Sequence, residues 1–395
     1  MMIQAVLGNP NHPEYGVATI PFPIPRDQYA HCMELLAAME IGDAVKADCK
    51  VEKIDSFYTV LKRAEMLTVN VEELNYLAKR LESFDSGEAA RFQAMAHKLE
   101  LFELKDLINL TFCCQQATVI TDFSDLAAIG RDHYMNLHGG SASVDELNAL
   151  DGEGTARQLI ESGSGTITPY GVVYDNGMKL EPVYDGRFFP CYYYEPNAIT
   201  VAVTSKSEPE DTNHITWLFL PMVQEEIDRA LLRGGITDPS EIRLSLEDSW
   251  LPHEVLDLLD MDHVDISELN ALVQALDEFS DMSIRKYAAA AVMARPHTTE
   301  QAKHLAENLD LFDFAPSAST PEEYGKYMIQ QSGHFDYDEN LDAFYDYEKY
   351  GTERMNEEDG MFTDRGYIAY KGYISMEEVM DGGQSNHMEM GGLSR

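Results

Sequence analysis

The spacing of apolar and polar residues predicts short strands and amphipathic helices from the start of the chain. Residues 3–7 and 17–24 have the composition and alternation of strands, and the Pro- and Asn-rich segment between them is typical of a turn. Apolar residues then recur at helical spacing over residues 26–39, and a further strand is predicted at 50–54. The chain therefore opens as a mixture of strands and helices.

Helical periodicity is clearest over residues 69–84, VNVEELNYLAKRLESF. Asn70 is predicted to cap this helix, and Glu73 three residues later completes the pattern of a capping box. Shorter elements follow, namely helices over 86–99, 104–110 and 124–135 and a strand over 117–121. Six glycines then predict loops up to a short strand at 171–174; they are Gly139, Gly140, Gly152, Gly154, Gly163 and Gly165.

The second half of the chain repeats the order of the first. Two long matches define the register: residues 200–220 with 3–23, and VDISELNAL from residue 264 with VNVEELNYL from residue 69. Gly351 likewise matches Gly154. The offset stays between 193 and 198 along the whole comparison, which indicates an internal duplication.

These patterns predict an α/β (α+β) fold with two tandem units of short strands and amphipathic helices. The predicted bounds are 1–180 for the first unit, 181–197 for a connector, 198–374 for the second unit and 375–395 for a flexible tail. The tail is rich in Gly, Met and Ser and has no periodicity, which is typical of a frayed terminus.

Charge changes this picture more than any other property. The 395 residues include 69 Asp and Glu against 29 Lys and Arg, a formal net charge of -40. Such a chain lacks the basic footprint that a phosphate backbone needs, so we expect no direct nucleic-acid binding and no docking on an anionic membrane. Because a duplex carries about one charge per ~1.7 Å of axis, forty charges correspond to roughly 70 Å of DNA. The alternative is that acidity only keeps the protein soluble.

Cysteine usage and apolar run lengths indicate the compartment. Five cysteines, an odd number without a CxxC motif, are typical of reduced thiols. The first residues lack the charged and apolar regions of a secretion signal, and no run reaches the ~18–20 apolar residues of a membrane span. We therefore expect a cytoplasmic protein.

Acidic residues are densest between Phe335 and Asp364. Eleven of these thirty residues are Asp or Glu, only Lys349 and Arg354 oppose them, and six aromatic residues lie between Phe335 and Tyr350. The alternative is a solvated helix face with Leu341, Phe344 and Tyr345 turned toward a core. Few Lys or Arg residues stand four positions from these acids, so the like charges are largely uncompensated. We interpret the segment as a surface that imitates DNA. The first copy has largely lost this density of acidic and aromatic residues.

Motifs for catalysis or metal binding are absent or incomplete. GEGTAR at 152–157 has Arg157 where a dinucleotide-binding motif needs its third glycine. The segment starting at Asp336 resembles a calcium loop, but Leu341 replaces the required glycine and Tyr347 the final glutamate. We predict no enzyme activity, no cofactor and no metal site.

The order of motifs between Tyr324 and Tyr370 resembles the ArdA antirestriction family. The matching stretches are YGKYMIQQSG, LDAFYDYEKYG and GMFTDRGYI, and the ELN-containing helices at 73–75 and 268–270 also fit. The resemblance implies an elongated chain of small mixed domains that imitates bent B-form DNA. It further implies occupation of the DNA-binding groove of type I restriction-modification enzymes, which protects mobile DNA, with no catalytic residues or cofactors.

The resemblance also implies which residues form the partner-binding surface. Asp342, Asp346 and Glu348 match the acids of the antirestriction motif, and the family's YGRD is replaced here by Tyr350-Gly351-Thr352-Glu353. The full candidate surface is Asp336, Asp338, Glu339, Asp342, Asp346, Tyr347, Glu348, Tyr350, Gly351, Glu353, Glu357, Glu358 and Asp359.

Three alternatives stay open at this point. The target could be another nucleic-acid-handling defence enzyme, such as a CRISPR nuclease. The protein could also be an acidic scaffold that binds a basic protein without imitating DNA. Family members typically pair as dimers, so a tandem chain is expected to form either an intramolecular pseudo-dimer or a homodimer.

Overall fold

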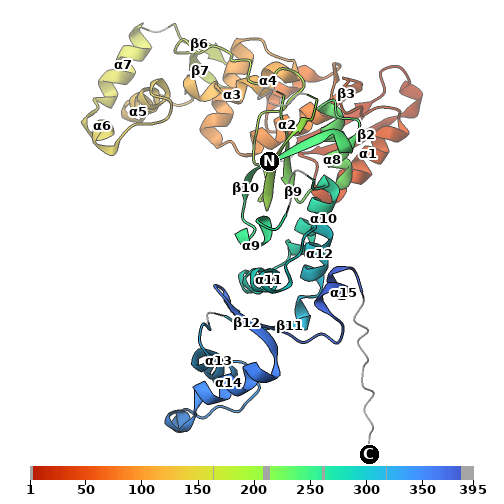
Figure 1. The fold of residues 1–395 in the computed structure, drawn as a ribbon. Helices are drawn as coiled ribbons and strands as arrows, with labels where there is room; N and C mark the ends of the chain where they lie inside the picture. Colours follow the sequence, from red (N-terminus) through yellow and green to blue (C-terminus); the bar gives the residue numbers. More distant parts are fainter. Residues whose placement is uncertain (1–2, 163, 208–213, 260–262, 317, 384–395) are drawn as a thin grey trace, which may run out of the picture. The chain divides into compact units, whose positions relative to one another are not determined.

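The computed structural model describes residues 3–162, 164–207, 214–259, 263–316 and 318–383 (Figure 1). These residues form a mixed structure, 46% helical and 18% strand, with several small sheets, which confirms the predicted α+β class. The chain divides into two compact units. Unit 1 comprises Met1–Pro196, Glu210–Trp217 and Val223–Thr237, and unit 2 comprises Asn197–Pro209, Leu218–Met222 and Asp238–Arg395.

Unit 1 begins with a four-stranded antiparallel sheet of order β2-β1-β3-β4. Its strands are β1 (Ile3–Gly8), β2 (Val17–Phe22), β3 (Cys49–Asp55) and β4 (Thr68–Val69). The helices of this part are α1 (Tyr29–Ala38), α2 (Val71–Glu82), α3 (Ser86–Lys98) and α4 (Leu104–Leu110). Short 3-10 helices lie at Pro13–Tyr15, Arg26–Gln28, Thr59–Ala64 and Cys114–Gln116.

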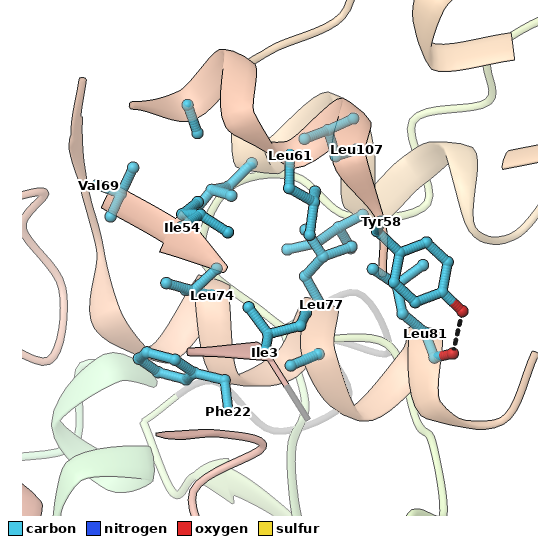
Figure 2. Close-up of a cluster of buried hydrophobic side chains, with 14 of the residues drawn as sticks. Ile3, Phe22, Ile54, Tyr58, Leu61, Val69, Leu74, Leu77, Leu81 and Leu107 are labelled. Atoms are coloured by element: carbon cyan, nitrogen blue, oxygen red, sulfur yellow. Dashed lines mark hydrogen bonds between the residues drawn. The ribbon is translucent and has the colours of Figure 1, made fainter. Parts of the chain in front are cut away.

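The core of unit 1 forms where the apolar face of α2 meets the sheet (Figure 2). Leu74 and Leu77 of α2 pack among Ile3 and other strand residues, all buried. The hydroxyl of Tyr58 donates to the carbonyl oxygen of Leu81 at 2.6 Å, which satisfies a buried polar group at the end of the helix. The apolar spacing that predicted this helix therefore defines its buried face.

The start of α2 differs in part from the prediction. The side chain of Asn70 caps the helix by accepting a hydrogen bond from the backbone N–H of Glu73. The Glu73 carboxylate instead accepts a hydrogen bond from the Tyr184 hydroxyl at 2.7 Å. Tyr184 belongs to residues 181–197, predicted as a connector; Tyr76 of α2 also stacks on Phe189 of this segment at 4.5 Å. These residues thus pack along α2.

A second, three-stranded sheet completes the first half of the chain. Its order is β5-β7-β6, from strands β5 (Thr118–Ile120), β6 (Thr166–Thr168) and β7 (Gly171–Tyr174). The helices beside it in sequence are α5 (Leu126–Leu137), α6 (Val144–Ala149) and α7 (Gly152–Ser162). Helices α6 and α7 occupy residues that were predicted as loops, so that prediction was wrong. A Cβ atom at Gly130 of α5 would lie 1.9 Å from the carbonyl oxygen of Gly152, which shows that these glycines allow two helices to touch.

Unit 2 also contains two sheets, of orders β10-β8-β9 and β11-β13-β12. The strands are β8 (Ile199–Ser205), β9 (Thr216–Leu220), β10 (Ile242–Ser249), β11 (Phe312–Pro316), β12 (Asp359–Thr363) and β13 (Gly366–Tyr370). The helices of the second half are α8 (Gln224–Arg233), α9 (His253–Leu256), α10 (Ile266–Leu276), α11 (Asp281–Ala294), α12 (Thr299–Glu307), α13 (Pro321–Gln330), α14 (Tyr347–Glu357) and α15 (Met376–Met380). Helix α8 and the first two residues of β9, Thr216 and Trp217, belong to unit 1. Further 3-10 helices lie at Pro239–Glu241, Leu309–Leu311 and Glu339–Phe344.

The predicted tail differs from the structure in its first part. Helix α15 forms there, and its residues Val379 and Met380 are buried, so this stretch is packed. The rest of the predicted tail, residues 384–395, lies outside the described residues.

The second sheet of each half has the same strand order and the same register. Val119 pairs with Val173 in unit 1, and Phe314 pairs with Ile368 in unit 2, at positions 195 residues later. The helix crossing follows the same offset, because the atom nearest a Cβ at Gly325 is the carbonyl oxygen of Tyr347. By this offset Gly351 corresponds to Ala156 in the structure, whereas the sequence comparison had matched it with Gly154. The duplication itself stays a prediction.

Candidate functional site

The acidic segment, Phe335–Asp364, follows helix α13 and includes α14 and β12 (Figure 1). Helices α13 and α14 touch through their backbones at two glycines. A Cβ atom at Gly351 would lie 1.8 Å from the carbonyl oxygen of Pro321, and one at Gly325 would lie 2.1 Å from that of Tyr347. Gly351 is buried, so among the candidate residues it shapes the segment and is not available to a partner.

Asp342 ties the segment together from within. Its Oδ1 accepts hydrogen bonds from the hydroxyls of Tyr347 at 2.5 Å and Tyr337 at 2.7 Å, and from Nε2 of Gln330 at 2.9 Å. The bonds from Tyr347 and Tyr337 hold the pKa of the Asp342 carboxyl below its usual range, because they stabilise its charged form. One carboxylate oxygen thus joins α13 and α14 to the loop between them.

Two further aspartates cap the helices of the segment. Asp346 accepts from the backbone N–H of Lys349 at 3.1 Å and starts α14. Asp338 accepts from the backbone N–H of Asn340 at 2.9 Å and starts the 3-10 helix Glu339–Phe344. The stretch that resembles one acidic helix is therefore two helices, each begun by an aspartate whose charge also favours the helix N-terminus.

Glu358 is turned toward the interior of unit 2. It accepts a hydrogen bond from the Tyr324 hydroxyl at 2.6 Å and forms an ion pair with Arg354. The Glu358 side chain is only 8% exposed. Arg354 also approaches Glu357 at 3.9 Å, so this cation offsets the acids at the end of α14. Among the candidate acids, Glu358 is the least accessible to a partner.

The remaining candidate acids are exposed and unpaired. Within the described residues none of them has a Lys or Arg side chain at ion-pair distance; they are Asp336, Glu339, Glu348, Glu353 and Asp359. Some acids of unit 1 are paired, as Glu72 is with Arg229 at 2.5 Å. The acidic segment therefore presents uncompensated negative charge on a braced scaffold.

The corresponding part of unit 1 keeps the scaffold and loses the charge. Asp151 accepts from the N–H of Gly154 at 3.0 Å, as Asp346 does 195 positions later. Glu153 is paired with Arg157 at 3.4 Å, and the position that matches Asp342 holds Leu147. The sequence comparison of the two copies indicated this loss.

The aromatic candidates have contacts of their own. Tyr347 and Tyr350 are both half-buried, and the ring of Phe335 meets that of Tyr350 edge-on at 5.8 Å. The alternative in which Leu341 and Phe344 face a core was wrong, since they are 48% and 83% exposed. Their three-residue spacing indicated a shared side of a helix but not whether that side faces the core or the solvent.

The described residues do not show the features of a metal site or of a membrane span. In the described ranges, no three His, Cys, Asp or Glu side chains gather as they would around a metal ion. Over the same ranges, no helix combines the length and apolar content needed to cross a bilayer. Asp338 and Asp342, the third and seventh positions of the calcium-like pattern, are each engaged in hydrogen bonds within the segment.

Comparison with known families gives a match over residues 212–369, to the family described as antirestriction protein (ArdA). The matched range contains α13, α14 and nearly all of the sheet β11-β13-β12, and so includes the whole acidic segment. No curated protein matches the chain.

Proposed function

Residues 212–369 match the antirestriction protein (ArdA) family, and from this premise we propose that the chain imitates DNA in the DNA-binding groove of a type I restriction-modification enzyme. An antirestriction function follows from the family. Imitation of DNA, the type I target and competition for the groove are the parts that we propose.

The observation that carries the proposal is the set of exposed, unpaired carboxylates on the braced pair α13 and α14. Unpaired like charges at a surface cost stability, so their retention favours a use for the field they create. A DNA-binding groove presents Lys and Arg, and carboxylates near phosphate positions complement them. Binding is then steered electrostatically and weakens as salt rises.

The structure favours some candidate residues over others for direct contact. Asp342, Asp346 and Glu358 are engaged within unit 2, so we assign them to building the surface. The acids proposed to meet the partner are the exposed and unpaired ones, Asp336, Glu339, Glu348, Glu353 and Asp359.

The test is DNA binding by a purified type I restriction-modification core complex, titrated with this protein at low and high salt. We expect displacement of DNA near stoichiometric amounts at low salt, with a loss of potency as salt rises. No displacement at low salt would reject the type I target.

A variant with Asp336→Asn, Glu339→Gln, Glu348→Gln and Glu353→Gln should compete more weakly and with a smaller salt dependence. A matched control removes the same number of charges from exposed acids elsewhere, with Asp27→Asn, Glu34→Gln, Glu225→Gln and Glu300→Gln. Equal loss in the two variants would mean that net charge alone acts, which contradicts a localised surface.

A further inference from the structure

Two apolar side chains project from the most acidic part of the protein. Leu341 and Phe344 lie in the 3-10 helix Glu339–Phe344 and are 48% and 83% exposed. Because side chains three residues apart align along a 3-10 helix, both lie on the same side of it. Exposed apolar side chains are unfavourable in water, and this pair differs from other exposed apolar residues in lying side by side within the most acidic segment.

The outward position of this pair is fixed by hydrogen bonds on a different side of the same helix. Asp342, the next residue after Leu341, is held by Tyr347, Tyr337 and Gln330. Successive residues of a 3-10 helix point about 120° apart, so the hydrogen bonds that hold Asp342 to α13 and α14 direct Leu341 away from these helices. The scaffold therefore presents the pair in one orientation.

Carboxylates adjoin the pair in sequence. Asp338, Glu339, Asp346 and Glu348 are exposed, and within the described residues none of them has a Lys or Arg at ion-pair distance. A partner must therefore bring positive charge around an apolar depression. Nucleic acid and anionic membrane do not fit, whereas a basic groove of a protein does.

We propose that Leu341 and Phe344 form an apolar anchor that enters a depression in the basic groove of the target enzyme. This inference rests on the proposed function and adds to it a contact that DNA does not make. Contacts between carboxylates and basic side chains weaken as salt rises, as do contacts between phosphates and those side chains. Burial of apolar area is not screened by salt. The anchor therefore adds to the binding of the groove a contribution that salt does not screen.

The test compares four proteins in the DNA-displacement assay with a type I core complex over a range of salt. They are the unchanged chain, Leu341→Ser with Phe344→Ser, the charge variant Glu339→Gln with Glu348→Gln, and a control with Val144→Ser and Ile167→Ser. The control residues are 73% and 83% exposed and lie in unit 1.

The anchor variant should lose about tenfold or more in potency at every salt concentration, the change expected when one large apolar side chain is no longer buried. Its salt dependence should match that of the unchanged chain. The charge variant should lose potency mainly at low salt and show a smaller salt dependence, and the control should behave as the unchanged chain does. Phe344→Leu, which keeps an apolar side chain, should retain most of the potency.

Each contrary result has a distinct meaning. Unchanged potency of the anchor variant, or a loss that disappears at high salt, overturns the anchor and leaves the proposed function standing. Failure of the unchanged chain to displace DNA overturns the proposed function instead. Because both side chains are exposed, unfolding of the anchor variant in a thermal melt would contradict the orientation on which the inference rests.

Discussion

At the scale of single residues, the candidate acids differ in what they contact rather than in what they are. Asp342 accepts three side-chain hydrogen bonds, while Glu353 has no cation at ion-pair distance within the described part of the chain. Both are aspartate or glutamate in the same acidic run, so composition alone cannot separate a residue that builds the surface from one that faces a partner. Asp342 is distinguished by its hydrogen bonds from Gln330 and Tyr347, which lie on two different helices, α13 and α14.

Replacement of Asp342 by Asn is predicted to loosen residues 331–346. The neutral amide accepts hydrogen bonds from Tyr347 and Tyr337 less strongly than the carboxylate does. Because the folded-state pKa of Asp342 is lowered, its contribution is complete above the unfolded-state pKa of about 3.9 and is lost as pH falls through the folded-state value. Amide hydrogen exchange should show faster exchange over this segment in the variant at neutral pH. The protection factors of the unchanged chain should approach those of the variant in acid, once the intrinsic pH dependence of exchange is removed.

Asp336→Asn provides the control, because Asp336 is exposed and has no hydrogen bond within the described residues. It should leave exchange over the segment unchanged. Equal protection in the Asp342 variant and the unchanged chain would contradict the conclusion that the hydrogen bonds of Asp342 hold the loop to α13 and α14.

At the scale of elements, apolar spacing predicted the helices that have a buried face. It did not predict the helices in which a glycine allows two helix backbones to touch. The apolar spacing of α2 marks its core residues, and its cap at Asn70 was confirmed. Helices α6 and α7 were read as loops because Gly152 and Gly154 are typical of turns. The sequence alone does not distinguish a glycine needed for contact with a neighbouring helix from a glycine in a turn. Only the position of Gly130 opposite Gly152 distinguishes them.

Gly351→Ala is predicted to destabilise unit 2 by about 1–3 kcal/mol, the usual cost of overpacking. The added Cβ would meet Pro321 and Gly325 across the contact between α13 and α14, so the two helices must separate. In a helix without such a contact, the same substitution stabilises by about 0.5–1 kcal/mol. The sign of the change is therefore diagnostic, and the midpoint of urea unfolding measures it. Thr352→Ala, at the exposed next position, should shift the midpoint little.

At the scale of the whole molecule, the boundary between the halves of the sequence is not the boundary between the compact units. Helix α8 follows the predicted start of the second unit at residue 198, yet it belongs to unit 1. Periodicity and internal matching predict that α8 forms but not which core it joins, because that depends on contacts far apart in sequence. Pairing of the two units within one chain stays a prediction.

The contact of α8 within unit 1 depends on Arg233, which is 4% exposed. Its guanidinium donates to the Ala44 carbonyl oxygen at 2.9 Å and to Oδ1 of Asn70 at 3.0 Å, and lies 3.6 Å from the Glu73 carboxylate. Arg233→Met removes these donors and leaves Glu73 half-buried without its cation. Burial already raises the pKa of Glu73, so losing the cation adds to an existing cost.

The Arg233 variant should lose about 3–5 kcal/mol of stability, as when one partner of a buried pair is removed. Arg243→Met, at an exposed position of β10, is the matched control and should change stability little. Denaturant unfolding followed by amide exchange locates the effect, which should spread through α2 and residues 181–197 and spare the acidic segment. If both substitutions shifted the midpoint equally, α8 would not be an integral part of unit 1. An effect confined to unit 1 would show that a residue from the second half of the sequence stabilises the first, so that the chain folds as interdependent halves.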